Sequence, residues 1–146
     1  MINFKNVTFS YKGSKENVLK DFSLHIKEGD RIWLSGASGR GKTTLLRLIM
    51  GLERVKKGKV ELKENIKIST VFQEDRLIPN LTVLKNIALF SSEEKAKELL
   101  NQLGLKGNED MPIYELSGGM KRRVALARAL SMDFDLLLLD EALNGL

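Results

Sequence analysis

The sequence predicts an α/β fold, and three observations support this. Short apolar or alternating stretches, typical of strands, are interspersed with segments of helical periodicity. A glycine-rich turn at residues 36–44 lies between a predicted strand and a predicted helix. An apolar run at 134–139 ends in two carboxylates, as expected of a strand in a buried parallel sheet. The 146 residues, 42% of them hydrophobic, suit one domain with a substantial core.

Composition restricts the function classes. The net charge is +5, but the lysines are scattered, so we expect a soluble surface and no nucleic-acid partner. There are no cysteines, which is compatible with a reducing compartment. The sequence has neither a membrane-length apolar run nor the apolar core of a signal peptide at its start.

The N-terminal segments predict an antiparallel β subdomain. Residues 2–11 and 18–26 alternate between apolar and polar, which indicates two half-exposed strands that pair across a polar turn. The short apolar run 31–35 predicts a strand that enters the glycine-rich turn. Apolar residues at helical spacing then predict a helix over 42–51, with Gly51 as its stop.

The remaining segments predict a core interrupted by helices. Residues 58–62 and 66–72 indicate two more strands. Helical periodicity follows over 81–105, with Thr82 or Ser92 as caps, and again over 117–130. The run 134–139 predicts a strand buried on both faces. We therefore expect an α/β core of residues 1–79 and 132–146 and a helical subdomain of residues 80–131.

The glycine-rich turn matches the phosphate-binding P-loop pattern G-x-x-x-x-G-K-[ST] and predicts a P-loop NTPase (RecA-like) core. Its glycines let successive N–H groups converge on phosphate oxygens, and the following helix adds positive potential. Lys42 is predicted to bind the outer phosphates and Thr43 to bind Mg²⁺. Arg40 either adds charge near the nucleotide or faces solvent. The alternative, a chance glycine turn before a helix, is disfavoured by the flanking strand and helix. The predicted nucleotide-binding residues of this turn are Gly36, Ala37, Ser38, Gly39, Arg40, Gly41, Lys42, Thr43 and Thr44.

An acidic pair, Asp140 and Glu141, follows the last predicted strand. Carboxylates at the carboxyl end of such a strand face the crevice where α/β sheets bind ligands. Asp140 is predicted to hold Mg²⁺, and Glu141 to polarise the attacking water as a general base. The alternative, two strand-ending charges in solvent, would be favoured if the chain had no P-loop.

The stretch Leu116-Ser117-Gly118-Gly119-Met120 lies between the P-loop and the acidic pair. It resembles the signature LSGGQ of ABC (ATP-binding cassette) proteins, with Met120 at the last position. With the other two motifs, it makes the whole chain similar to the nucleotide-binding domain of an ABC transporter. By itself, the same stretch would also suit an ordinary helix cap.

The resemblance implies roles for two further residues. Gln73 resembles the Q-loop glutamine, a ligand of the metal and a catalytic residue that acts on water. From the residue alone, it would be a polar side chain at a strand end. Tyr11 resembles the aromatic residue that stacks on adenine, a role that Phe9 would take if the strand register slipped by two.

The resemblance also implies partners and a location. Two such domains pair head to tail, and each ATP, with Mg²⁺, lies between the P-loop of one and the signature turn of the other. Ser117 can cap a helix and donate to phosphate, while Gly118 and Gly119 allow close backbone approach. Membrane-spanning transporter subunits would be further partners, which places the chain in the cytoplasm at the inner face of the cell membrane. A soluble ABC ATPase and a non-hydrolysing nucleotide-dependent binding module are the alternatives.

The chain departs from the family pattern at its end. The family continues with a D-loop aspartate, a further core strand and a switch histidine, whereas Ala142 stands where proline is common and residues 144–146 include no aspartate. We therefore expect a C-terminally truncated domain that lacks the last core strand or strands, in which ATP binding is retained and steady hydrolysis is in doubt. A fragment, a partner chain that completes the sheet, or self-association would each account for this. His25 is expected to be structural, and Arg122, Arg123 and Arg128 to form a solvated or subunit-facing side of their helix.

Overall fold

The computed structural model describes residues 1–141 of the chain, which form parts of two compact units, Met1–Ile66 and Lys67–Leu146. The expected D-loop region, with Ala142 and residues 144–146, lies outside the described residues. None of the helices within residues 1–141 is both long and apolar enough to cross a bilayer.

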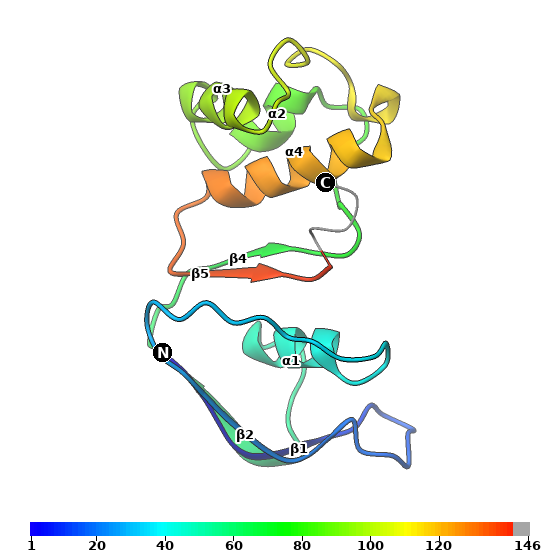
Figure 1. Ribbon diagram of the computed structural model, residues 1–146, viewed down its shortest axis with the longest axis vertical. Helices are drawn as coiled ribbons and strands as arrows, with labels where there is room; N and C mark the ends of the chain where they lie inside the picture. The colour runs from blue at the N-terminus through cyan, green and yellow to red at the C-terminus, as the bar shows by residue number, and fades with distance from the viewer. Residues whose placement is uncertain (142–146) are drawn as a thin grey trace. The chain divides into compact units, whose positions relative to one another are not determined.

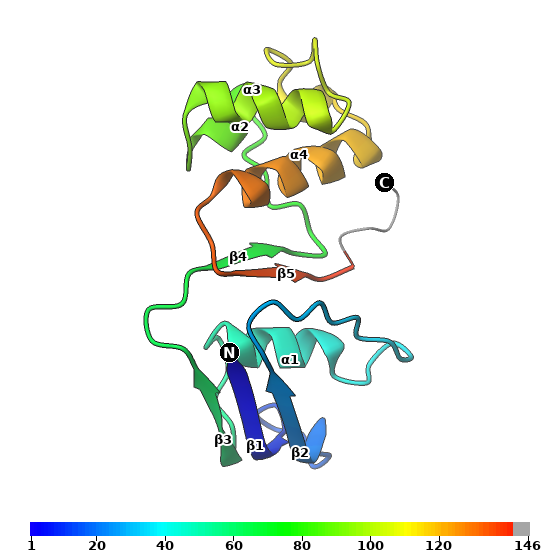
Figure 2. The same ribbon diagram turned by 60° about the vertical axis from the view of Figure 1, so that its left-hand side comes forward.

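The first unit is an antiparallel sheet accompanied by one helix (Figure 2). Strands β1 (Ile2–Phe9), β2 (Leu19–Ile26) and β3 (Lys57–Leu62) take the order β2-β1-β3, and the helix is α1 (Lys42–Ile49). The predicted pair of antiparallel strands is confirmed as β1 and β2, and β3 adds to the other edge of β1. Alternate residues of β1 and one side of α1 form the core: Ile2, Phe4, Val7, Phe9, Leu45, Leu46, Leu48 and Ile49.

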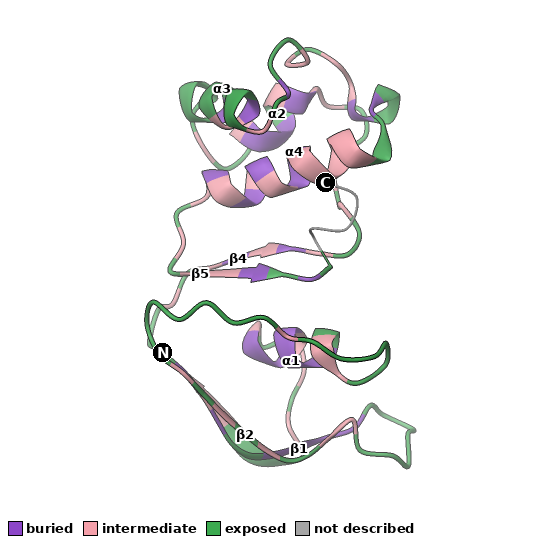
Figure 3. Ribbon diagram, viewed as in Figure 1, coloured by how far each residue is buried: buried purple, intermediate pink, exposed green. Residues whose placement is uncertain are grey.

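Helix α1 ends as the sequence predicts. Gly51 has a φ of 68°, and the N–H of Leu52 donates to the carbonyl of Arg47 at 3.0 Å. This turns the chain out of the helix and satisfies a carbonyl of its last turn. Figure 3 shows the buried residues of α1 along part of its surface, in keeping with an amphipathic helix.

The prediction of a strand at residues 31–35 is wrong. This segment has no regular structure, and Ile32 and Trp33 are 47% and 79% exposed. A short apolar run becomes a strand only where a neighbouring strand supplies hydrogen-bonding partners. Within the described part of the chain, the outer strands of the first sheet, β2 and β3, pair only with β1.

The second unit is a layered arrangement of a small sheet and helices (Figure 1). Strands β4 (Ile68–Val71) and β5 (Leu136–Leu139) are parallel and in register from Ile68↔Leu136 to Val71↔Leu139. Helix α4 (Gly118–Ser131) lies between this sheet and the pair α2 (Val83–Ala88) and α3 (Glu93–Gln102). A 3₁₀ turn at Ile113–Glu115 precedes α4.

The helical region predicted over 81–105 is confirmed as two helices, and the two candidate caps, Thr82 and Ser92, begin one helix each. The hydroxyl oxygens of Thr82 and Ser92 accept hydrogen bonds from the N–H groups of Lys85 and Lys95. Such caps satisfy N–H groups that have no partner within the helix. The three helices bury one apolar cluster, made of Val83, Ile87, Ala96, Leu100, Leu105, Ile113, Leu116, Val124 and Ala127.

The predicted burial of the last strand on both faces is wrong for β5. Leu138 is buried, but Leu139 is 39% exposed and the other two leucines are half-buried. Among the described strands, only β4 pairs with β5, so one edge of β5 has no neighbouring strand there.

Asn86 of α2 fixes the chain that enters the helical region. It is fully buried; its Oδ1 accepts from the N–H of Ile78 at 2.8 Å, and its Nδ2 donates to the carbonyls of Ile78, Leu81 and Thr82. Asn86→Ala removes the side-chain acceptor of the Ile78 N–H and the side-chain donor of the three carbonyls, which keep their backbone donors. We therefore expect it to reduce the free energy of unfolding by about 3 kcal/mol. Urea denaturation would measure this, with exposed Asn101→Ala on α3 as the control. Equal losses in both variants would contradict the prediction.

Candidate functional site

The glycine-rich turn of residues 36–41 leads directly into α1. Gly41 occupies the N-cap position with φ 88°, and a methyl group there would lie 2.9 Å from Cγ1 of Val18. Glycine at this position therefore permits both the left-handed backbone and close packing on the start of β2. Among the described residues, no side chain caps this helix, and no acidic residue lies in its first turn.

Lys42 extends back along the turn that precedes it. Its Nζ donates to the carbonyls of Gly36 at 2.7 Å and Ala37 at 3.0 Å, which holds the ammonium group against the start of the loop. An ammonium charge, the positive end of a helix dipole and an exposed loop backbone therefore lie together. Such an arrangement attracts a polyanion, and phosphate in particular.

Thr43 is exposed in the first turn of α1, whereas Thr44 is buried. Oγ1 of Thr44 shares a hydrogen bond of 2.8 Å with the hydroxyl of Tyr11, which joins the chain after β1 to the helix. Phe9 is 3% exposed and meets the Tyr11 ring edge-to-face at 5.0 Å. Phe9 is therefore a core residue, while Tyr11 is 36% exposed.

In the second unit, three predicted site residues follow the carboxyl ends of the paired strands β4 and β5. They are Gln73, Asp140 and Glu141. Val71 pairs with Leu139, and the N–H of Asp140 donates to the carbonyl of Val71 at 2.9 Å. Asp140 is 9% exposed, whereas Gln73 and Glu141 are exposed. Glu141 has a φ of 51°, an uncommon conformation for a residue with a side chain, and such residues cluster at functional sites.

Ser117 is the N-cap of α4, as predicted, and its Oγ accepts from the N–H of Met120 at 3.3 Å. Leu116 anchors the turn in the helical core at 5% exposure. Gly118 is exposed, and a methyl group there would meet no described atom within 4 Å. Packing among the described residues therefore does not require glycine at this position. Gly119 follows it in the first turn of α4.

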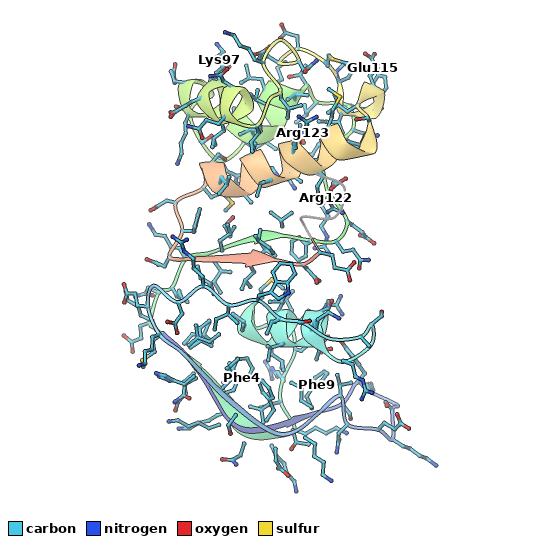
Figure 4. All side chains as sticks on the ribbon, viewed as in Figure 1. Phe4, Phe9, Lys97, Glu115, Arg122 and Arg123 are labelled. Atoms are coloured by element: carbon cyan, nitrogen blue, oxygen red, sulfur yellow. The ribbon has the colours of Figure 1, made fainter. Side chains whose placement is uncertain are left out.

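The expectation that the arginines of α4 form a solvated side is wrong, because all three are half-buried and bind backbone carbonyls. A subunit-facing side stays a prediction. Arg122 donates to the carbonyls of Phe72 at 2.9 Å and Gln73 at 2.8 Å, and Arg128 donates to those of Asp75 and Arg76. Arg123 donates to the carbonyls of Leu103 and Gly104 after α3. Figure 4 shows Arg122 and Arg123 on different sides of α4. Burial lowers the pKa of Arg128, an effect that the nearby charge of Asp75 opposes.

The donor set suits Mg²⁺, which prefers hard oxygen ligands and keeps several of its waters. The predicted ligands are a hydroxyl, an amide and a carboxylate, of Thr43, Gln73 and Asp140. Among residues 1–141, no cluster of three or more His, Cys, Asp or Glu residues is placed to hold a metal.

Comparisons with known proteins agree on one family. The family model described as ABC transporter matches residues 19–144. The chain is 42% identical to the spermidine/putrescine import ATP-binding protein PotA of Mesoplasma florum, over 100% of this chain and 46% of that protein. It is 41% identical to the aliphatic sulfonates import ATP-binding protein SsuB of Bacillus subtilis, over 99% of this chain and 62% of that protein.

Solved structures give the same result for the fold. The ATP-binding cassette MJ0796, solved as a dimer in a post-hydrolysis state bound to ADP and Pi, is 34% identical, with a TM-score of 0.86. That match covers 100% of this chain and 76% of the other. The predicted fold class, a P-loop core with an antiparallel β subdomain and a helical insertion, is confirmed. The chain belongs to the ABC transporter family and, within it, to the ATP-binding cassettes.

Proposed function

We propose that this chain is the ATP-binding part of an ABC transporter and that it binds Mg-ATP at residues 36–44. The observation that supports this best is Lys42, whose ammonium group lies against the start of a glycine loop, before a helix that no described side chain caps. Backbone N–H groups of the loop bind the phosphates, and Lys42 neutralises the outer ones. The ring of Tyr11, an exposed residue, stacks on adenine.

For hydrolysis, we assign Mg²⁺ coordination to Thr43, Gln73 and Asp140 and the role of general base to Glu141. Bound Mg²⁺ would neutralise charge that develops on the phosphate oxygens. Glu141 orients the attacking water and accepts its proton, and Gln73 helps to position that water. The parallel pairing of β4 and β5 supports these roles. Gln73 lies two residues after the end of β4, and Asp140 and Glu141 directly follow the end of β5, which pairs with it.

A second ABC domain is the partner that we propose for the signature turn, in a head-to-tail dimer. The open space around Gly118 supports this, since nothing described within the chain requires glycine there. The turn of residues 116–119 would then supply backbone N–H groups, the Ser117 hydroxyl and a helix N-terminus to the partner's ATP. The MJ0796 cassette was solved as a dimer.

We place the assembled protein in the cytoplasm, at the inner face of the membrane, through transporter subunits that span the bilayer. The relatives are import proteins with different named substrates, polyamines for PotA and sulfonates for SsuB. Import is therefore the direction that we propose, whereas the different substrates single out no cargo.

Lys42→Ala tests the binding site directly. Hydrogen bonds from a charged donor contribute up to about 3 kcal/mol, so we expect the affinity for Mg-ATP to fall about 100-fold. Isothermal titration calorimetry would measure this, with Lys20→Ala on the exposed part of β2 as a control of equal charge change. Unchanged ATP affinity in the Lys42 variant would exclude the proposed site.

A phosphate-release assay beside the calorimetry separates an ATPase from a non-hydrolysing binding module. Binding with release supports the ATPase. Binding without release, even at high protein concentration, supports a nucleotide-dependent assembly module. Absence of both would contradict each of these functions.

A further inference from the structure

We propose that Arg122 is a positioning residue for Gln73, and that it joins the Q-loop backbone to the helix that begins at the signature turn. This rests on the proposed function, in which Gln73 acts on the metal and the attacking water. The inference comes from hydrogen bonds between segments that are 50 residues apart in the sequence.

The guanidinium of Arg122 has two acceptors on consecutive residues. Its NH1 lies 2.9 Å from the carbonyl oxygen of Phe72, and its NH2 lies 2.8 Å from that of Gln73. The planar fork of arginine suits such two-point binding, which fixes direction as well as distance. Arg122 binds the main chain of Gln73 and not its side chain, which is exposed.

Further contacts hold the same segment. Arg128 donates to the carbonyls of Asp75 and Arg76 at 3.1 and 2.9 Å, so two arginines of α4 bind four carbonyls of residues 72–76. The Asp75 carboxylate lies 3.1 Å from NH1 of Arg122 as an ion pair. The Arg76 guanidinium lies 3.7 Å above the Phe72 ring.

At its other end, α4 is also bonded to β4. The buried Ser69 hydroxyl donates to the carbonyl of Ala129 at 2.7 Å. Helix α4 is therefore bonded near its C-terminal end to β4 and near its N-terminal end to the segment after β4. Bonds at both ends of a helix restrict its local opening. Arg122 lies five residues after Ser117, so it joins Gln73 to the first turns of α4 and thereby to the signature turn.

Two readouts test the proposal in the full chain, each with Arg123→Ala as the matched control. Arg123 also lies on α4 and also binds backbone carbonyls, but those of Leu103 and Gly104. The first readout is the ¹⁵N order parameter, without nucleotide, of residues 73 and 74, whose N–H groups share peptide planes with the two carbonyls that Arg122 binds. We expect about 0.85 in the wild type and in the control, and below about 0.6 in Arg122→Ala. Unchanged order in Arg122→Ala would overturn the proposal.

The second readout is a double-mutant cycle on ATP turnover. Arg122→Ala should lower kcat about tenfold, as the loss of a residue that orients a metal ligand does, with the KM for ATP unchanged. Arg122→Lys, which keeps the charge but loses the fork, should restore kcat only in part. In a Gln73→Ala background, Arg122→Ala should have no further effect on kcat. An equal loss in both backgrounds would show a merely structural contribution and overturn the proposal.

The two hypotheses fail in different ways. A wild-type protein without turnover would contradict the proposed hydrolysis, whereas the order parameters would still decide whether Arg122 holds Gln73. Normal turnover in Arg122→Ala would overturn the positioning role and leave the proposed function intact.

Discussion

Glu141→Gln is expected to lower ATP turnover about 1,000-fold while the affinity for Mg-ATP stays unchanged. Glutamine has the same shape but cannot accept a proton, and a general base contributes about 10²- to 10⁴-fold to a rate. Glu141 is exposed after β5, with a backbone φ of 51° that directs it differently from a residue continuing the strand. The groups of this chain assigned to its own ATP are Tyr11 and residues 36–44, so the substitution leaves them intact.

The measurement is phosphate release at saturating ATP beside a calorimetric titration. Glu74→Gln is the matched control, because Glu74 is exposed next to Gln73 and the substitution removes the same charge. Wild-type turnover in Glu141→Gln would exclude Glu141 as the base. Equal losses of turnover in both variants would indicate an effect of charge near the carboxyl ends of β4 and β5 rather than proton transfer.

Gly58→Ala is expected to destabilise the protein by about 4 kcal/mol, among the largest effects of single substitutions. Gly58 has a φ of +77°, and a methyl group there would lie 2.3 Å from the carbonyl oxygen of Lys5 and 2.4 Å from that of Asn6. Both neighbours are backbone atoms of β1, in the stretch where its pairing with β3 shifts register, so no rotamer change can relieve the overlap.

Circular dichroism would report this as a fall in Tm of about 10 °C for a chain of this size. Gly13→Ala separates the two causes, because Gly13 has a φ of +85° but no described atom within 4 Å of an added methyl group. The control should lose only the cost of the left-handed backbone, about 1 kcal/mol. Similar losses in both variants would show that the close approach to β1 contributes nothing.

The features that the sequence predicted correctly depend on short-range contacts. The caps Thr82, Ser92 and Ser117 each bind an N–H group three residues ahead. The stop at Gly51 likewise depends on residues within one turn of helix. Spacing along the chain contains all the information that such features need, and this is also true of the P-loop pattern at 36–43.

The features that the sequence missed depend on distant partners. The run 31–35 has the composition of a strand, but no described strand of the first unit pairs with it. The roles of Arg122 and Arg128 depend on carbonyls at residues 72–76, because a solvated arginine and one that binds main-chain carbonyls have the same sequence signal. Gly58 appears in the sequence only as the start of a strand.

The sequence by itself determined the family, the order of the motifs and the chemistry available at each one. Only the tertiary structure decided that the arginines of α4 bind the segment after β4, and that β1 approaches Gly58 too closely for a side chain. The physical reason is that motifs and caps are formed by neighbours along the chain. Arginine–carbonyl pairs and backbone contacts between strands depend instead on which distant segments folding brings together.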